Sequence, residues 1–163
     1  MDAINSLSTY KAYFKELATG TTGHKDLKAF YYGDIKRLLE AKRGNITYPC
    51  LWLELPSIPI QDHGSQNFQI NLSGAFAIIT NSTQDDYDKQ DDIIENNFQI
   101  THDIISRIKR DSFSVPRLFN LDLNSFRMDP IARWNTDNCF GWRTEFKINN
   151  AFVLDYISSK WNP

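Results

Sequence analysis

The chain opens with two segments in which apolar positions follow the period of an α-helix. In the first, apolar side chains recur at helical spacing: Ile4, Leu7, Tyr10, Phe14 and Leu17. This spacing lays one apolar stripe along a helix, which a left-handed Gly20 would end. The second segment repeats the period: Leu27, Phe30, Tyr31, Ile35, Leu38 and Leu39. Gly44 and Asn45 would end it, so residues 1–45 are expected to form a helical N-terminal part with two helices.

The period shortens to that of β-strands over residues 46–81. Residues 47–56 form a short apolar run flanked by prolines, which favours a strand at a sheet edge. Residues 68–80 alternate between two faces without interruption, and we predict one long antiparallel strand there, bent or bulged at Gly74. At ~3.3 Å per residue such a strand spans roughly 43 Å, so part of it should reach beyond the body of the protein.

A helical period returns over residues 83–110 and predicts one helix of roughly 39 Å, long enough to lie along the whole strand. One face of this helix carries apolar side chains and a threonine: Tyr87, Ile94, Phe98, Thr101, Ile105 and Ile108, with Ile93, Ile100 and Ile104 beside them. The last part, residues 114–157, is predicted to contain strands at 118–124, 126–134 and 139–148, with a turn at 135–138.

These elements show no regular alternation of strand and helix, which disfavours a parallel sheet of βαβ units. We expect a single α+β domain over residues 1–163. In it, an antiparallel or mixed β-sheet has the long helix packed on one face, and two helices precede the sheet. A chain of 163 residues is long enough to bury its own core without disulfides or metals.

Composition narrows the classes of partner. The net charge of −2 and the pI near 5.9 provide no broad positive field, which disfavours sequence-independent nucleic-acid binding by the whole surface. Cys50 and Cys139 are far apart in sequence, with no nearby Cys or His, and are expected to be buried free thiols. No secretory signal pattern and no apolar run of ~18 residues is visible, so we expect no membrane contact and a protein that is made and used in the cytoplasm, or is assembled there into something larger.

Two charge clusters fall on the ends of the long helix. The acidic cluster, at its start, comprises Asp85, Asp86, Asp88, Asp91 and Asp92. A metal site would need these carboxylates to converge, but capping and the helix dipole already favour acids in a first turn. Arg107, Lys109 and Arg110 at the other end are explained by the same dipole, and a nucleic-acid patch there is the alternative. Four cations end the second predicted helix in the same way: Lys36, Arg37, Lys42 and Arg43.

One tripeptide raises an enzymatic alternative. Glu145-Phe146-Lys147 on a strand is the Glu-x-Lys pattern with which metal-dependent nucleases hold a divalent ion and polarise a water. An exposed strand with alternating charge gives the same pattern, the upstream dipeptide is Asp129-Pro130 rather than the reverse, and no second acid is placed to share the metal. A surface pair across strands is therefore favoured over a nuclease.

The sequence contains no motif for a catalytic triad, a zinc site or a phosphate-binding loop. His24, His63 and His102 lie in three different segments, and neither a Gly-x-Ser-x-Gly elbow nor a phosphate-binding glycine loop occurs. We therefore expect no catalytic, cofactor-binding or metal-binding residues, and no enzyme. Among the tryptophans, Trp142 is predicted to lie in the core, while Trp161 is the better candidate for a protein interface.

Three short segments carry a resemblance to a known family, in the order in which they occur. They are Tyr48-Pro49-Cys50-Leu51-Trp52-Leu53-Glu54, Asn71-Leu72-Ser73-Gly74-Ala75-Phe76 and Asn138-Cys139-Phe140-Gly141-Trp142-Arg143. With the long helix between the second and third, residues 30–150 resemble the tail-terminator and tail-completion proteins of long-tailed bacteriophages and of phage-derived injection systems.

The resemblance implies a non-catalytic structural subunit that forms a ring, commonly a hexamer, on the end of the tail tube. Its partners would be copies of itself, the tail-tube protein and a neck or sheath component, and it would touch DNA only if DNA passes through the ring. It would assemble in the cytoplasm of the host bacterium and remain in the tail of the virion or phage-like particle. Two alternatives stay open: an adaptor of another bacterial complex, and a nuclease using Glu145 and Lys147.

Overall fold

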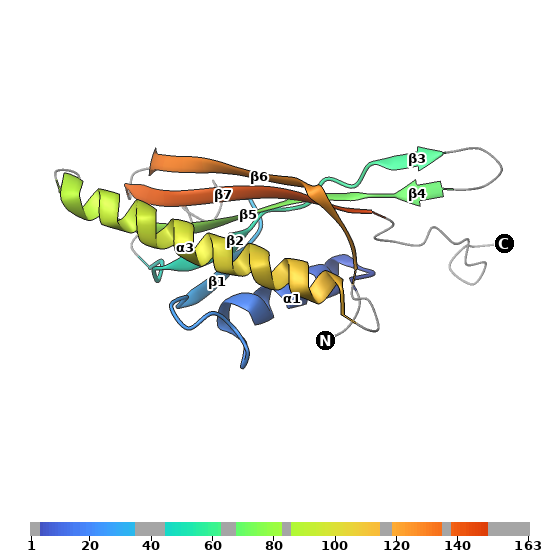
Figure 1. Ribbon diagram of the computed structural model, residues 1–163, viewed down its shortest axis with the longest axis horizontal. Helices are drawn as coiled ribbons and strands as arrows, with labels where there is room; N and C mark the ends of the chain where they lie inside the picture. The colour runs from blue at the N-terminus through green and yellow to red at the C-terminus, as the bar shows by residue number, and fades with distance from the viewer. Residues whose placement is uncertain are drawn as a thin grey trace.

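The computed structural model describes residues 4–34, 45–62, 68–82, 86–114, 119–134 and 138–149. Figure 1 shows the arrangement of the elements, with α1 and α3 on one side of a sheet and a narrow ribbon extending from one end. The elements are α1 (Leu7–Thr19), β1 (Ala29–Tyr32), β2 (Cys50–Leu53), β3 (Ile60–Asp62), β4 (Phe68–Ile70), β5 (Leu72–Asn81), α3 (Tyr87–Ser112), β6 (Asn120–Trp134) and β7 (Cys139–Asn149).

The main sheet has five strands in the order β1-β2-β5-β7-β6. β1 runs parallel to β2, whereas the other neighbouring pairs are antiparallel, so the sheet is mixed. Both α1 and α3 contribute to one apolar core on a single face of this sheet. The predicted α+β class and the long helix packed on a face are confirmed.

The first helix is capped as its sequence allows. Thr9 N–H donates to Ser6 Oγ (3.1 Å), and Ser6 N–H donates to Thr9 Oγ1 (3.0 Å), which completes a reciprocal capping box. Gly20 ends the helix in an extended conformation with φ −76° and ψ 177°, so the predicted left-handed stop is wrong. A Cβ at this position would lie 2.0 Å from the Glu16 carboxyl carbon. The glycine therefore provides space rather than a left-handed turn.

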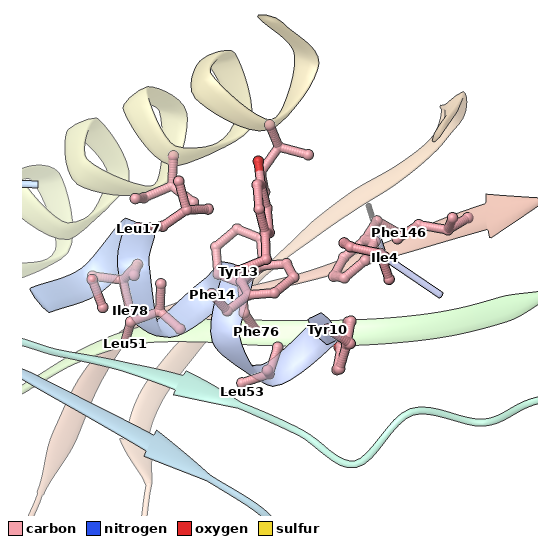
Figure 2. Packing of buried hydrophobic residues seen from close by; sticks show 14 of the residues in the cluster. Ile4, Tyr10, Tyr13, Phe14, Leu17, Leu51, Leu53, Phe76, Ile78 and Phe146 are labelled. Atoms are coloured by element: carbon pink, nitrogen blue, oxygen red, sulfur yellow. The ribbon is translucent and has the colours of Figure 1, made fainter. Parts of the chain in front are cut away.

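Aromatic side chains dominate the core between α1 and the sheet (Figure 2). The Phe14 ring lies 5.4 Å from the Phe146 ring and 5.7 Å from the Phe76 ring, measured between centroids. Tyr10 contacts the same cluster above Gly74, where a Cβ would lie 2.6 Å from the Tyr10 hydroxyl. Pairing of β5 with β7 continues without a shift through this glycine, so it does not mark a bulge. Its role is to admit Tyr10.

The second predicted helix is wrong over the part that the structure describes. Residues 29–32 form β1, an edge strand, because three consecutive aromatic residues fit a pleated surface better than a helix. Gly33 follows at φ 125°, and its carbonyl accepts a hydrogen bond from the Trp52 indole at 3.1 Å. β2 lies between β1 and β5, so its predicted edge position is also wrong. Residues 35–44, with their four cations, lie outside the described residues.

The predicted strand 68–80 is two strands, separated at Asn71. β5 belongs to the main sheet, whereas β4 pairs with β3 in a separate two-stranded ribbon. Ser57 and Ser73 exchange backbone hydrogen bonds of 2.9 and 2.8 Å where the ribbon meets the sheet. The single long strand is therefore wrong, but the predicted extension beyond the body is confirmed, because β3 and β4 extend away from the helices (Figure 1).

The second half of the chain follows its predicted elements with two differences. α3 begins at Tyr87 after the N-cap Asp86, but Tyr87 is 63% exposed and does not belong to the buried face. The buried face instead includes Asn97, which accepts from the Thr80 hydroxyl and donates to the Phe140 carbonyl. The two strands predicted at 118–124 and 126–134 form one strand, β6, whose register shifts between Asp122 and Arg127. The strand predicted at 139–148 is β7.

Candidate functional site

The face of the main sheet opposite α1 and α3, called here the far face, is divided into two halves. One half is an apolar cluster: Cys50, Trp52, Ala77, Ile79 and Cys139, all buried. The other half, the polar patch, lies toward the ribbon and comprises Glu54, Asp122, Arg127, Asp129, Arg143, Glu145 and Lys147. The pleat places these charges together because alternate residues of a strand point to the same face.

Opposite charges stand across from each other where β6 pairs with β7. Arg127 is opposite Glu145, and Asp129 is opposite Arg143. Arg127 also reaches along its own strand to Asp129, with an Nη2–Oδ1 distance of 3.0 Å. Charges arranged in this way hold the two strands in register, and each exposed pair stabilises the sheet by about 0.2–1 kcal/mol.

Arg143 is the centre of the polar patch. Its Nε and Nη2 donate to the two oxygens of Glu54 at 2.6 and 2.9 Å, and its Nη1 donates to Glu145 at 2.5 Å. The side chain crosses β5 to reach Glu54, and it can do so because Ala75 and Ala77 are the β5 residues on this face. The hydrogen bonds that Arg143 donates to Glu54 are the largest cause of its raised pKa, against the opposing effect of burial.

The proposed nuclease tripeptide lies on the far face, with Glu145 and Lys147 on the same side of β7. Glu145 is bound to Arg143, so a divalent ion would have to compete with that guanidinium for its carboxylate. Among the described residues, no three His, Cys, Asp or Glu side chains converge on a possible metal position. The nuclease alternative stays a prediction, and no contact in the described part of the chain favours it.

A trough lies in the polar patch beside the ribbon. It has a volume of about 300 Å³ and is lined by Ser73, Gly74, Ala75, Ser125, Arg143, Glu145, Phe146 and Lys147. The short side chains of Ser73 and Ala75 on β5 leave this space open. The register shift of β6 brings Ser125 to the rim, where its Oγ accepts from Lys147 N–H at 2.8 Å. The lining contains one carboxylate, Glu145, and two cations, of which Arg143 already binds Glu145 and Glu54, so Lys147 is the lining group suited to pair with an incoming anion.

The ribbon is the second prominent surface. Its strands contain three paired positions, Ile60 with Ile70, Gln61 with Gln69, and Asp62 with Phe68. Ile60 is 57% exposed, and Leu55, which precedes the ribbon, is 59% exposed, whereas Ile70 is buried. An extended two-stranded arm with exposed apolar side chains is suited to contact with another polypeptide, since an isolated ribbon is at best marginally stable in water.

A histidine and an aspartate that are distant in sequence meet beside α3. His24 Nε2 lies 3.3 Å from Asp103 Oδ2, while His24 Nδ1 accepts from Asp26 N–H at 3.3 Å. Arg107 and Thr22 help to line the adjoining cavity of about 170 Å³. This pair could not be predicted from the sequence, because its members are 79 residues apart and belong to no motif. Since both imidazole nitrogens have partners, the pair fastens the loop after α1 to α3.

The charge clusters of α3 are placed largely as their positions predicted. Asp86 caps the helix by accepting from Lys89 N–H at 3.2 Å, while Asp85 lies outside the described residues. At the other end, Arg107 pairs with buried Asp111 at 2.8 Å, and Asp111 also accepts from the Tyr13 hydroxyl at 3.2 Å. Burial first, and then Asp111, raises the pKa of Tyr13. Figure 2 shows Tyr13 pointing from α1 toward α3.

Both cysteines are buried and free, as predicted. Burial is the main cause of a raised Cys50 pKa, so its thiol is poorly suited to act as a nucleophile. Trp142 is half-buried, stacks edge-on against Phe98 at 5.4 Å and donates to the Ile94 carbonyl at 3.0 Å, which joins β7 to α3. Trp161, the predicted interface residue, and His63 lie outside the described residues.

Neither described helix combines the length and the apolar composition that a membrane span requires. Comparison of the chain with protein-family models, with curated proteins and with solved structures found no match.

Proposed function

We propose that the protein is a structural assembly subunit, of the kind that forms the terminating ring on the tail tube of long-tailed bacteriophages and related injection systems. Copies of the chain would form a closed ring, with six subunits as the expected number. The ring would stop growth of the tube and give the next component, a neck or sheath protein, a surface to dock on.

The projecting ribbon is the observation that carries this proposal. β3 and β4 extend beyond the two-layer body (Figure 1). Ile60 in β3 is exposed, as is Leu55, which precedes the ribbon. An arm of this kind gains stability when a neighbouring subunit covers it, and identical subunits joined through two different surfaces close into a ring when the rotation between them allows.

The polar patch supports the same proposal in a different way. Its ion pairs are only partly buried, with Arg143 and Glu54 each 32% exposed, so they can remain hydrated until a partner arrives. Interfaces of assembling subunits use such charges mainly to select the partner and to fix its orientation.

The function is tested by adding the purified protein to growing tubes of the tail-tube protein from the same source. We expect tube growth to stop, with a ring visible at tube ends by electron microscopy. Tubes that keep the same length distribution and carry no ring would contradict the function. An unrelated α+β protein of similar size serves as the control.

A further inference from the structure

The exposed side of α3 carries four acids at helical spacing. Asp88, Asp91, Asp92 and Glu95 occupy helical positions i, i+3, i+4 and i+7, and all are exposed. They form one stripe, called here the acidic stripe, of roughly 10 Å. The helix dipole stabilises only Asp88, because its effect is confined to the first turn. Glu95 accepts from Gln99 Nε2 at 2.9 Å. Acids at i and i+4 repel each other, so Asp91 and Asp92, for which no hydrogen bond or ion pair is seen in the described part of the chain, cost the isolated helix stability.

The trough on the far face contains a side chain whose charge is opposite to that of the acidic stripe. Lys147 is exposed and has no carboxylate partner within the described part of the chain. Asp122, its neighbour across the strands, instead accepts from Asn124 N–H at 3.1 Å. Arg143 already binds two carboxylates through Nε, Nη1 and Nη2. Lys147 is therefore the trough cation that remains available to an incoming carboxylate.

The acidic stripe and the trough lie at opposite ends of the molecule. The first half of α3 contacts the start of β7, through the Asn97–Phe140 and Ile94–Trp142 hydrogen bonds. Lys147 lies seven residues after Phe140 along β7, or about 23 Å further on. It is paired with Ser73, where the ribbon meets the sheet. The two features also lie on opposite faces of the sheet. They cannot meet within one chain.

We propose that the trough of one copy receives the acidic stripe of the next copy. The inference rests on the proposed ring and names the surfaces that would join its subunits. Two different surfaces at opposite ends make a head-to-tail contact, which is the type that closes into rings. A carboxylate of the stripe pairs with Lys147, while the short side chains of Ser73 and Ala75 on this face of β5 leave room for it.

Charge exchange between the two surfaces tests this inference. The trough variant is Lys147→Glu, and the stripe variant combines Asp91→Lys with Asp92→Lys. Each side chain is exposed, so both variants should fold, which circular dichroism and thermal unfolding would verify. Each variant alone places like charges against each other, and we expect its self-association to weaken at least about tenfold. Lys15→Glu, an exposed change on α1, is the matched control and should assemble normally.

Mixing the two variants gives the decisive result. In the mixture, the acidic stripe of one variant meets the native trough of the other, and the reversed charges meet as well, so assembly should return. Variants that assemble like the native chain, or a mixture no better than its components, would overturn the inference while leaving the ring itself intact. A native chain that stays monomeric with and without tube protein would overturn both.

Discussion

Arg143 on β7 holds Glu54, the residue after β2, through two hydrogen bonds that cross the intervening strand β5. The two residues are 89 positions apart in the sequence. Their contact depends on alanines at positions 75 and 77, since a larger side chain on this face of β5 would block the guanidinium. The pair therefore ties the second strand of the sheet to the fourth across its far face.

Replacing Arg143 with methionine should destabilise the fold by about 1 kcal/mol, because a bidentate pair is lost but both partners are already partly hydrated. Urea unfolding measures the change. Arg127→Met is the control, since Arg127 is 71% exposed and its pair with Asp129 contributes less. If both variants lose the same free energy of unfolding, the contact between Arg143 and Glu54 adds nothing to stability.

Gly74→Ala should destabilise the protein by about 1–3 kcal/mol, because the new Cβ would lie 2.6 Å from the Tyr10 hydroxyl and 2.7 Å from Phe146. The Tyr10 hydroxyl is buried without a hydrogen-bond partner among the described residues. Tyr10→Phe should therefore be neutral or stabilising alone and should recover part of the loss in the double variant. If the stability changes of Gly74→Ala and Tyr10→Phe simply add in the double variant, the proposed clash between the new Cβ and the Tyr10 hydroxyl is wrong.

Stability should fall as the pH rises above about 10. Burial raises the pKa of Tyr10 and of Tyr13 above the ordinary value of 10.0, and Asp111 adds to the effect at Tyr13. The unfolded chain loses these protons near that pH whereas the folded chain keeps them, so deprotonation favours unfolding. Ultraviolet titration should show two tyrosines ionising only as the protein unfolds. Tyr13→Phe should keep the protein stable to a higher pH than the native chain. A native chain whose stability stays constant through pH 11 would refute this prediction.

DNA incubated with the protein and magnesium or manganese should remain uncleaved, because Glu145 is bound to Arg143. The control is Glu145→Ala, and we expect the native protein and this variant to show the same background level of DNA cleavage. Metal-dependent cleavage that disappears in the variant would instead establish the nuclease alternative.

Local pattern was sufficient for much of this fold. The spacing of Tyr10, Phe14 and Leu17 predicted α1, and the alternation over 139–148 predicted β7. The prediction of a helix over residues 27–34 was wrong because aromatic residues at helical spacing also fit an edge strand. Only pairing with β2 decides between helix and strand. The sequence pattern pointed to Glu145 and Lys147 of the polar patch, but it did not predict that Arg143 lies at the centre of the patch. Contacts such as Arg143–Glu54 and His24–Asp103 depend on strand order and packing, which no local period contains.

Ile60→Asp should abolish assembly and leave the free energy of unfolding within about 0.5 kcal/mol of the native value, because Ile60 is exposed in the ribbon. Sedimentation and urea unfolding measure the two quantities. Leu123→Asp is the matched control, since Leu123 is an exposed apolar residue of β6, 41% accessible and outside the ribbon. Loss of assembly in both variants would mean that the ribbon has no special role.

The ring itself is tested most directly by native mass spectrometry of the unaltered chain over a range of concentrations, with and without tail-tube protein. We predict one closed stoichiometry, expected to be six, that does not grow into longer chains as the concentration rises. A protein that remains monomeric at every concentration in both conditions would contradict the account.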